Sequence, residues 1–296
     1  MILGLIGVGT WGKNILATLE KIPNVEVKYL CAKNPESLVG FEKKYEKISD
    51  WRKLLDKPDL DGVCIATPPA THAEIAAAFV ERGKAVLVEK PMVTNLEDAL
   101  KLQAIVQKKS SLLMVGFEYL FNDHITYLKK EIEKGTFGKI LEVTYEHYVS
   151  PSRSDVDIFW DVAPHPFSIF QYLFNPEKLT SSEGKIEREI VSVKIQFQNS
   201  PLLEINATSS GSTKTRKLVL LGENATATLD ETVTENKLSI IKNGKILFPE
   251  IRASAPLQNE LEHFIQCIQS GKTPLTDVDF GCKITEWLET ISKNQK

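Results

Sequence analysis

Two side chains that could move a proton lie four residues apart in the stretch DIFWDVAPHPFS, which runs from Asp157 to Ser168. They are Asp161 and His165, and aromatic residues and two prolines surround them. An imidazole titrates near neutral pH, which suits His165 to general acid or base work. Residues four apart share a face of a helix. Because Pro164 and Pro166 suit only a first helical turn, we expect a helix to begin between Asp161 and Pro166, with an irregular first turn.

Two other roles are open for this pair. Asp161 could cap the first turn of the helix, and His165 could then be a buried histidine with a purely structural hydrogen bond. A metal bound by the pair would need further ligands. The remaining histidines show no supporting pattern, and we expect no metal site; they are His72, His124, His147 and His263.

A lysine is the third candidate. Lys90 stands in Glu89-Lys90-Pro91, directly after the apolar run 85–88. A second proline-containing loop, Thr67-Pro68-Pro69-Ala70-Thr71-His72, follows the apolar run 61–66. Open α/β sheets bind ligands at the carboxyl ends of their strands, and so we expect Lys90 to point into a cleft. A surface pair of Glu89 with Lys90 is the alternative. For His72, a hydrogen bond at a helix start and direct contact with a cofactor are equally open.

A glycine-rich loop indicates what ligand that edge binds. Gly7-Val8-Gly9-Thr10-Trp11-Gly12 follows the apolar run 2–6 and precedes a segment with helical periodicity. In a dinucleotide-binding loop the first glycine permits a tight turn, the second lets the backbone approach a pyrophosphate, and the third lets the helix pack closely. The helix N-terminus then binds the phosphates. The alternative is a glycine turn without a ligand.

The second strand ends without the acidic residue that commonly binds the ribose of NAD. The residues there are Ala32 and Lys33. Ala32 leaves room and Lys33 offers a positive charge, which slightly favours NADP over NAD as the cofactor. A solvated loop lysine is the alternative reading of Lys33.

The elements that must position these residues change character near residue 120. Up to residue 117, short apolar runs alternate with amphipathic helices, a pattern typical of a doubly wound parallel sheet. One of the helices is expected over Pro35–Glu46. Beyond residue 120 the runs are long and alternate apolar with polar residues, as in an antiparallel sheet with one face on a core. We therefore predict a Rossmann domain over 1–120 and an α+β domain over 121–296.

Composition excludes several classes of partner. The 296 residues have a formal net charge of −3 with the basic residues spread along the chain, which predicts no nucleic-acid or membrane partner. We see no apolar run long enough to span a bilayer and no signal peptide. The four cysteines form no C-x-x-C pair, and buried thiols in the reducing cytoplasm fit them best; they are Cys31, Cys64, Cys267 and Cys282.

Several of these motifs together resemble the Gfo/Idh/MocA family (glucose–fructose oxidoreductase, inositol dehydrogenase and relatives). They are the glycine loop, the proline loop with His72, Glu89-Lys90-Pro91, the segment from Gly116 to Asn122, Trp160-Asp161 with His165, and the ending Glu260–Phe264 with Gly271 and Pro274. The resemblance implies a Rossmann domain followed by an open-faced, mostly antiparallel sheet. It implies NAD(P)-dependent hydride transfer on a sugar, cyclitol or nucleotide sugar, and a homodimer or homotetramer. Ala32 and Pro166 depart from residues that are often acidic in the family.

At the matching positions the resemblance implies that Lys90, Asp161 and His165 are catalytic. We expect His165 to be the general base, Lys90 to stabilise the charge that develops on oxygen, and Asp161 to position substrate or histidine; Lys90 and His165 could exchange roles. Trp160 is expected beside the cofactor. Further substrate contacts are expected at Tyr119, Asn122, Tyr148 and Arg153, which are otherwise ordinary loop or core residues. The alternatives to this enzyme are a non-catalytic sensor that binds NAD(P) and a sugar, and a reductase of a non-sugar carbonyl.

Overall fold

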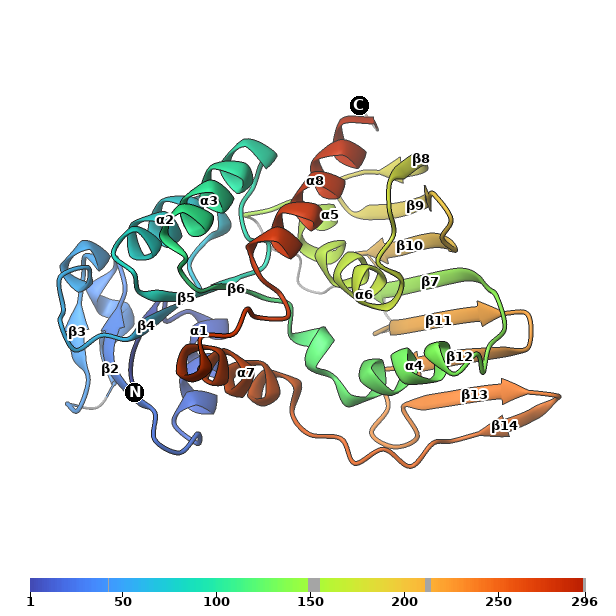
Figure 1. Cartoon of the computed structure of the whole chain (residues 1–296), viewed down its shortest axis with the longest axis horizontal. Helices are drawn as coiled ribbons and strands as arrows, with labels where there is room; N and C mark the ends of the chain where they lie inside the picture. Colours follow the sequence, from blue (N-terminus) through green and yellow to red (C-terminus); the bar gives the residue numbers. More distant parts are fainter. Residues whose placement is uncertain (42, 149–154, 211–213, 295–296) are drawn as a thin grey trace. The chain divides into compact units, whose positions relative to one another are not determined.

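The computed structural model describes residues 1–41, 43–148, 155–210 and 214–294 (Figure 1). The chain forms two compact units. The first comprises Met1–Glu118 and Leu257–Glu286, and the second comprises Tyr119–Pro256 and Trp287–Lys296. Each unit is described by itself below.

A six-stranded parallel sheet forms the first unit. Its strands have the order β3-β2-β1-β4-β5-β6, which is the strand order of the dinucleotide-binding Rossmann fold. Helices α1 (Thr10–Leu19) and α7 (Pro256–Ser270) cover one face, and α2 (His72–Glu81) and α3 (Leu96–Lys109) cover the other (Figure 1). The predicted doubly wound sheet is thus confirmed. The strands are β1 (Ile2–Ile6), β2 (Glu26–Cys31), β3 (Glu46–Ile48), β4 (Gly62–Ile65), β5 (Ala85–Glu89) and β6 (Leu113–Gly116).

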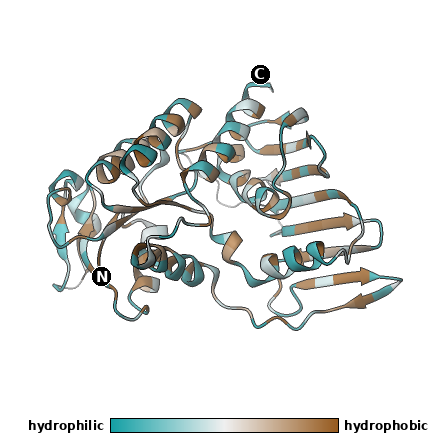
Figure 2. Cartoon of the chain, in the orientation of Figure 1, coloured by the Kyte–Doolittle hydropathy of each residue, from teal (hydrophilic) through white to brown (hydrophobic). Residues whose placement is uncertain are grey.

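The central strands of this sheet lie in the core of the unit. Every residue of β4, β5 and β6 is buried. Figure 2 shows the same strands as nearly continuous hydrophobic ribbons. Helices on both faces exclude water from both sides of the sheet, and this is why the strands are apolar throughout rather than alternating.

The prediction of a helix over Pro35–Glu46 is wrong. The chain forms a single 3-10 turn, η1 (Pro35–Leu38), which is capped by the side chain of Asn34, and later adds the short edge strand β3. Gly40 follows the turn with a φ of +90°, a left-handed conformation that a helix does not continue through.

The chain returns to the first unit near its end. Thr276 Oγ1 donates to the carbonyl of Val115 over 2.7 Å, and the backbone N–H of Val115 donates to the carbonyl of Thr276 over 2.7 Å. Helix α8 (Val278–Asn294) then begins, and its Cys282 thiol donates to the carbonyl of Ala99 in α3. The first unit therefore includes 257–286, which the predicted boundaries assigned to the second, because this segment covers the open edge of β6.

The second unit contains an eight-stranded sheet with the order β14-β13-β12-β11-β7-β10-β9-β8. Strands β7 and β10 pair in parallel, and all the other described pairs are antiparallel, as predicted. The strands are β7 (Ile140–Tyr148), β8 (Leu179–Ile186), β9 (Ile190–Phe197), β10 (Leu202–Thr208), β11 (Arg216–Gly222), β12 (Ala225–Asp230), β13 (Leu238–Lys242) and β14 (Lys245–Leu247).

One face of this sheet is covered and the other is open. Helices α4 (Asp123–Glu133), α5 (Ile158–Val162) and α6 (Pro164–Phe174) belong to the covered face, where the Phe170 and Phe197 rings stack with centroids 5.3 Å apart. Along β10 and β12, buried residues alternate with partly exposed ones. Figure 2 accordingly shows mixed colours along these strands. Within the described part of the unit, no helix lies on the second face (Figure 1).

Two details of this sheet differ from the sequence prediction. Strand β8 was not predicted, because its sequence LTSSEGKI is polar and it lies at the sheet edge, pairing only with β9. Residues 238–248, which belong to the long alternating runs beyond residue 120, form a hairpin of β13 and β14 rather than a single strand. Its turn residues Asn243 and Gly244 both have positive φ, as a tight hairpin turn requires.

Candidate functional site

The glycine loop connects β1 to α1 at the carboxyl edge of the first sheet. Gly7 has a φ of +97°, and a Cβ there would lie 2.4 Å from the carbonyl oxygen of Ala66. A Cβ on Gly12 would lie 2.0 Å from the carbonyl oxygen of Gly7, so the helix packs against the turn as closely as glycine allows. A Cβ on Gly9, by contrast, would meet no described atom within 4 Å. The backbone is therefore open at Gly9, where a dinucleotide's pyrophosphate is expected to approach.

The N-terminus of α1 retains its capacity to bind an anion. Gly9 is its N-cap residue and supplies no side-chain cap, and the first turn, with Thr10 and Trp11, carries no acidic residue. The amide N–H groups of the first turn and the positive end of the helix dipole favour a phosphate at this position. The residues of the loop thus fit the predicted cofactor, with Val8 buried beneath them.

The side chain of His72 contacts both loops that follow β4 and β5. Its side chain is 1% exposed, with Nδ1 2.9 Å from the carbonyl oxygen of Pro91 and Nε2 2.8 Å from that of Thr67. Both ring nitrogens of His72 therefore lie within hydrogen-bond distance of a backbone carbonyl, one in each loop. Thr71 Oγ1 also donates to Thr67 Oγ1, next to Pro68. This arrangement supports a positioning role for His72 rather than direct contact with a cofactor.

A buried carboxyl group links the glycine loop to Lys90. Trp11 Nε1 donates to Glu89 Oε1 over 2.5 Å, and the backbone N–H of Lys90 donates to Glu89 Oε2 over 3.3 Å. Glu89 is 8% exposed. Burial raises the pKa of Glu89 to about 7; the hydrogen bond from Trp11 opposes this shift, and the negative charge of Glu118 adds to it. Glu89 is therefore a buried anchor, rather than half of a surface pair with Lys90.

A second carboxyl group, that of Glu260 in α7, is fully buried. Neither of its oxygens has a hydrogen-bond partner among the described residues. Burial and the negative charges of Glu89 and Glu118 raise the pKa of Glu260 well above its ordinary value. Because an unpaired buried carboxylate is costly, this environment favours the neutral carboxyl form of Glu260.

Ala32 and Lys33 follow β2 at the same edge. Ala32 is partly buried, and its N–H donates to the carbonyl of Ile48 in β3. Lys33 is exposed. No acidic residue of the described chain forms an ion pair with Lys33, so its ammonium group is available to a ligand.

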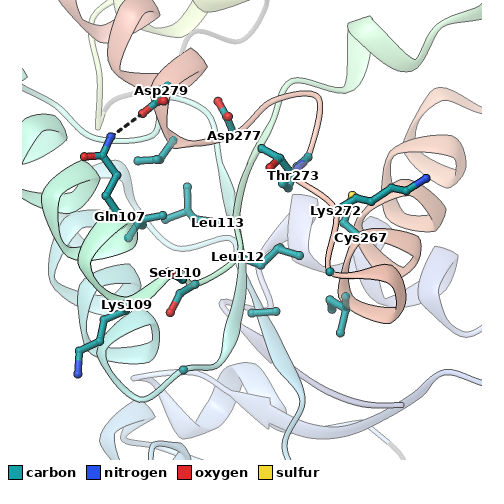
Figure 3. A pocket seen from close by; sticks show the side chains of 18 of the residues that line it. Gln107, Lys109, Ser110, Leu112, Leu113, Cys267, Lys272, Thr273, Asp277 and Asp279 are labelled. Carbon is teal, nitrogen blue, oxygen red and sulfur yellow. Dashed lines mark hydrogen bonds between the residues drawn. The ribbon is translucent and has the colours of Figure 1, made fainter.

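The first unit has another hollow at the opposite edge of its sheet (Figure 3). It lies at the amino ends of β5 and β6, beside Leu112, Lys272 and Asp277, and a hydrogen bond joins Gln107 to Asp279 at its rim. Parallel α/β sheets bind cofactors at their carboxyl ends, and the glycine loop lies there. The hollow therefore lies at the opposite edge of the sheet from the glycine loop.

In the second unit, Asp161 and His165 lie on two consecutive short helices. Asp157 caps α5 by accepting from the N–H of Trp160 over 2.9 Å, so Asp157, and not Asp161, is the helix cap. Ala163 separates α5 from α6, and Pro164 occupies the first turn of α6. The four-residue spacing of the pair therefore crosses a helix junction, which is the irregular first turn that the prolines predicted. Asp161 and His165 are both partly exposed.

Tyr119 and Arg216 extend this group of residues. The Tyr119 and His165 rings meet edge to face, with centroids 4.6 Å apart. The guanidinium group of Arg216 lies 5.6 Å from the centroid of the Tyr119 ring, and its Nε donates to His147 Nε2 over 3.3 Å. We did not predict roles for Arg216 or His147. Their signal in the sequence was a cation and a histidine at core-facing positions of alternating strands.

The other predicted contacts have diverse surroundings. Trp160 Nε1 donates to Ser292 Oγ over 3.2 Å. The amide of Asn122 caps α4 by accepting from the N–H of His124, and it donates to Glu231 Oε1, so a structural role already accounts for it. Tyr148 ends β7 and is partly exposed. Arg153 lies outside the described residues.

Two kinds of feature are absent from the described residues. Among them, no group of three or more His, Cys, Asp or Glu side chains could hold a metal ion. None of the described helices has the length and apolar character that crossing a membrane would need. All four cysteines are buried free thiols.

Comparison with known proteins identifies the class of this fold and site. Residues 1–117 match the Gfo/Idh/MocA family model, described as an oxidoreductase family with an NAD-binding Rossmann fold. The chain is 25% identical over 306 residues to the NAD-dependent scyllo-inositol 2-dehydrogenase of Bacillus subtilis, a match that covers 94% of this chain and 88% of that protein. It is 36% identical over 153 residues to levoglucosan dehydrogenase of Pseudarthrobacter phenanthrenivorans, covering 47% and 38%.

Solved structures match both units. A crystal structure from Magnetospirillum magnetotacticum has a TM-score of 0.84 at 28% identity, covering 98% of each chain. The 3-ketoreductase KijD10 of Actinomadura kijaniata, in complex with TDP-benzene and NADP, has a TM-score of 0.88 at 18% identity, covering 99% and 96%; at that identity it shows the fold alone.

These matches confirm the family resemblance, and the family model itself matches residues 1–117. The chain spans only part of some relatives. It aligns with 54% of the length of the oxidoreductase YrbE of Bacillus subtilis, at 27% identity over 186 residues, and with 38% of levoglucosan dehydrogenase.

Proposed function

We propose that this protein is an NAD(P)-dependent oxidoreductase that transfers a hydride between the nicotinamide and a hydroxyl-bearing or carbonyl carbon of a sugar, cyclitol or nucleotide sugar. The glycine loop carries the proposal, because it leaves the backbone open at Gly9 beside the uncapped N-terminus of α1. The names of relatives support the substrate class, since they include inositol and levoglucosan dehydrogenases and a dideoxyglucose 3-reductase.

The residues of this chain would handle the proton and the charge. A bound nicotinamide would supply the chemistry of hydride acceptance or donation at the substrate carbon. In oxidation, His165 takes the proton of the hydroxyl on that carbon, which leaves a carbonyl. Lys90 binds the same oxygen and stabilises its developing negative charge, and Asp161 holds the substrate or the imidazole in place. Reduction runs the same steps in reverse, with His165 returning the proton. A positioned acid or base of this kind contributes roughly 10²- to 10⁴-fold to the rate.

A screen tests the proposal. Aldoses, cyclitols and nucleotide sugars are incubated with the protein and with NAD or NADP, and nicotinamide absorbance is followed. We expect turnover of at least one of them, and we expect His165→Asn and Lys90→Met each to lower kcat about 100-fold or more while cofactor affinity stays near that of the wild type. Near-normal kcat in both variants would refute the mechanism. Cofactor binding with no turnover of any substrate would favour a non-catalytic sensor.

The cofactor preference is a finer proposal. We infer that the enzyme accepts NADP and that Lys33 binds its 2′-phosphate. The exposed ammonium group and the lack of an acidic residue at Ala32 support this. Lys33→Ala should raise the Kd of NADP about tenfold and leave that of NAD unchanged, whereas Lys21→Ala, an exposed lysine at the other end of α1, should change neither. An unchanged ratio of the two Kd values would remove Lys33 from the cofactor site.

We also propose that the open face of the eight-stranded sheet joins two copies of the chain, and that the protein is cytoplasmic. The apolar side chains of Ile190, Leu221 and Ile241 support the first point, since each is at least 40% exposed on that face. The four buried free thiols support a reducing compartment.

A further inference from the structure

The covered face of the eight-stranded sheet changes from apolar to polar at one end. On β7 the core-facing residues run from Val143 through Tyr145 to His147. On the neighbouring strand β11 they run from Leu220 through Leu218 to Arg216, and the register pairs Arg216 directly with His147. An arginine at the end of an otherwise buried apolar row is unusual, because desolvating a guanidinium group is costly unless an anion accompanies it.

Protein groups hold the Arg216 side chain on two sides without neutralising it. Its Nε donates to His147 Nε2 over 3.3 Å, and its guanidinium group lies 5.6 Å from the centre of the Tyr119 ring. His147 is 9% exposed, and its Nδ1 lies 3.4 Å from the Tyr145 hydroxyl. No carboxylate of the described chain forms an ion pair with Arg216, and its two terminal nitrogens make no hydrogen bond to a described residue. The two terminal nitrogens of the partly exposed guanidinium group, called the Arg216 fork below, therefore keep four N–H donors for a ligand.

The position of this fork matters because Tyr119 also contacts His165. The Tyr119 ring meets the imidazole of His165 edge to face at 4.6 Å and meets Arg216 as well. A substrate whose hydroxyl is bound by His165 therefore has a second group within reach of Arg216, one aromatic ring away. A guanidinium fork binds carboxylate or phosphate oxygens in pairs.

We propose that Arg216 is a specificity-determining residue and that the substrate carries an anionic group, a carboxylate or a phosphate, which the Arg216 fork binds. The proposal rests on the proposed function, because it takes His165 as the residue at the reacting carbon. It narrows the substrate class to acidic sugars and cyclitols, sugar phosphates and nucleotide sugars, and it excludes uncharged sugars as the preferred substrates.

Matched pairs of substrates test this inference. Glucose is compared with glucuronate, which adds a carboxylate, with glucose 6-phosphate, and with UDP-glucose; myo-inositol is a further uncharged member. For the wild type we expect kcat/KM for one of the acidic compounds to exceed that of glucose and of myo-inositol by at least tenfold. Comparing kcat/KM for glucuronate with that for glucose 6-phosphate shows whether the Arg216 fork binds a carboxylate or a phosphate. A wild type that prefers the uncharged members would overturn the inference.

Variants separate binding by Arg216 from a structural role. Arg216→Gln should raise KM for the acidic substrate about 10- to 100-fold with little change in kcat, and Arg216→Lys should recover part of the loss, since it keeps the charge without the fork. Lys217→Gln, next in sequence but paired with Asp230 on the open face, should behave as the wild type. Equal losses on acidic and uncharged substrates would indicate that Arg216 is only structural.

Equilibrium binding distinguishes this inference from the proposed function. The Kd of glucuronate and of glucose 6-phosphate is measured with the cofactor-loaded wild type and with cofactor-loaded Arg216→Gln. Arg216-dependent binding without turnover would support the anion site and refute the oxidoreductase. Turnover of uncharged sugars with no effect of Arg216 would refute the anion site alone. Absence of binding of either anion at millimolar concentration would also refute it.

Discussion

The indole of Trp11, within the glycine loop, donates a hydrogen bond to the carboxyl group of Glu89, the residue before Lys90. Its hydrogen bond to Glu89 spans the glycine loop and the end of β5. We predict that Trp11→Phe raises the Kd of the dinucleotide about 3- to 30-fold, because the loop loses one charge-assisted anchor and is less well ordered before binding. Fluorescence titration of the reduced cofactor measures this. Trp51→Phe, in a ring contact with Phe79 away from the loop, is the matched control, and equal Kd values in the two variants would contradict the prediction.

The chemistry-bearing residues differ in how well the sequence alone predicts them. The turn of the glycine loop is predictable because the spacing of its glycines directly after an apolar strand is visible in a few consecutive residues. Arg216 and His147 were not predicted, since their contact joins strands whose residues are 69 apart in sequence and depends on the register of β7 with β11. Asp161 and His165 were singled out, but the cap at Asp157 was not, because it belongs to the separate short helix α5, whereas the helix that the prolines predicted begins at Pro164.

At the scale of elements, the capped helix α5 holds Asp161 and leads to His165. Asp157→Ala removes the side-chain acceptor of its first turn, and we predict a loss of about 0.5–2 kcal/mol in the free energy of unfolding together with a lower kcat. Asn95→Ala removes the cap of α3, whose side chain accepts from the N–H of Asp98, and should cost similar stability without changing kcat. Thermal unfolding and initial rates of both variants provide the comparison; a normal kcat in Asp157→Ala would contradict it.

The sequence predicts a strand reliably where all its residues are buried, and poorly where the strand lies at a sheet edge and is partly exposed. Strands β4 and β5 are buried throughout, so their apolar runs are unambiguous. The edge strands β3 and β8 carry polar residues that water can solvate, and their sequences resemble those of loops. The predicted Pro35–Glu46 helix failed for another reason, because Gly40 takes a left-handed conformation that a helix does not continue through.

At the scale of the molecule, two buried carboxyl groups make stability depend on pH. The pKa of Glu89 is raised from 4.5 to about 7 and that of Glu260 is also raised well above 4.5, so as pH rises from about 4.5 the folded chain holds protons that the unfolded chain has released. Stability from these groups is therefore complete below about pH 4.5 and declines as pH rises, by at most about 1.4 kcal/mol per pH unit for each group. Glu260→Gln should flatten the decline in unfolding temperature between pH 5 and 8. A slope equal to that of the wild type would contradict this.

Association through the open sheet face is testable at the same scale. Leu221→Glu places a charge on that face without entering the core, since Leu221 is 41% exposed. We predict that the wild type is at least dimeric by light scattering and that the variant shifts toward monomer while keeping its circular dichroism spectrum, because burying an unpaired carboxylate in an interface is unfavourable. The substitution Lys21→Glu, outside the sheet, should leave the mass unchanged. A monomeric wild type would refute association.

The contact between Val115 and Thr276 also has a consequence for the order in which a ribosome completes the protein. Strand β6 emerges early, yet the segment that covers its edge is made 161 residues later, after the whole second sheet. Throughout that interval a nascent chain presents an apolar strand edge able to pair with other chains. A chain whose synthesis stops before residue 276 is therefore expected to associate with other chains through the edge of β6, and not to form a smaller working Rossmann domain. Covering that edge is one of the last steps in the folding of the protein.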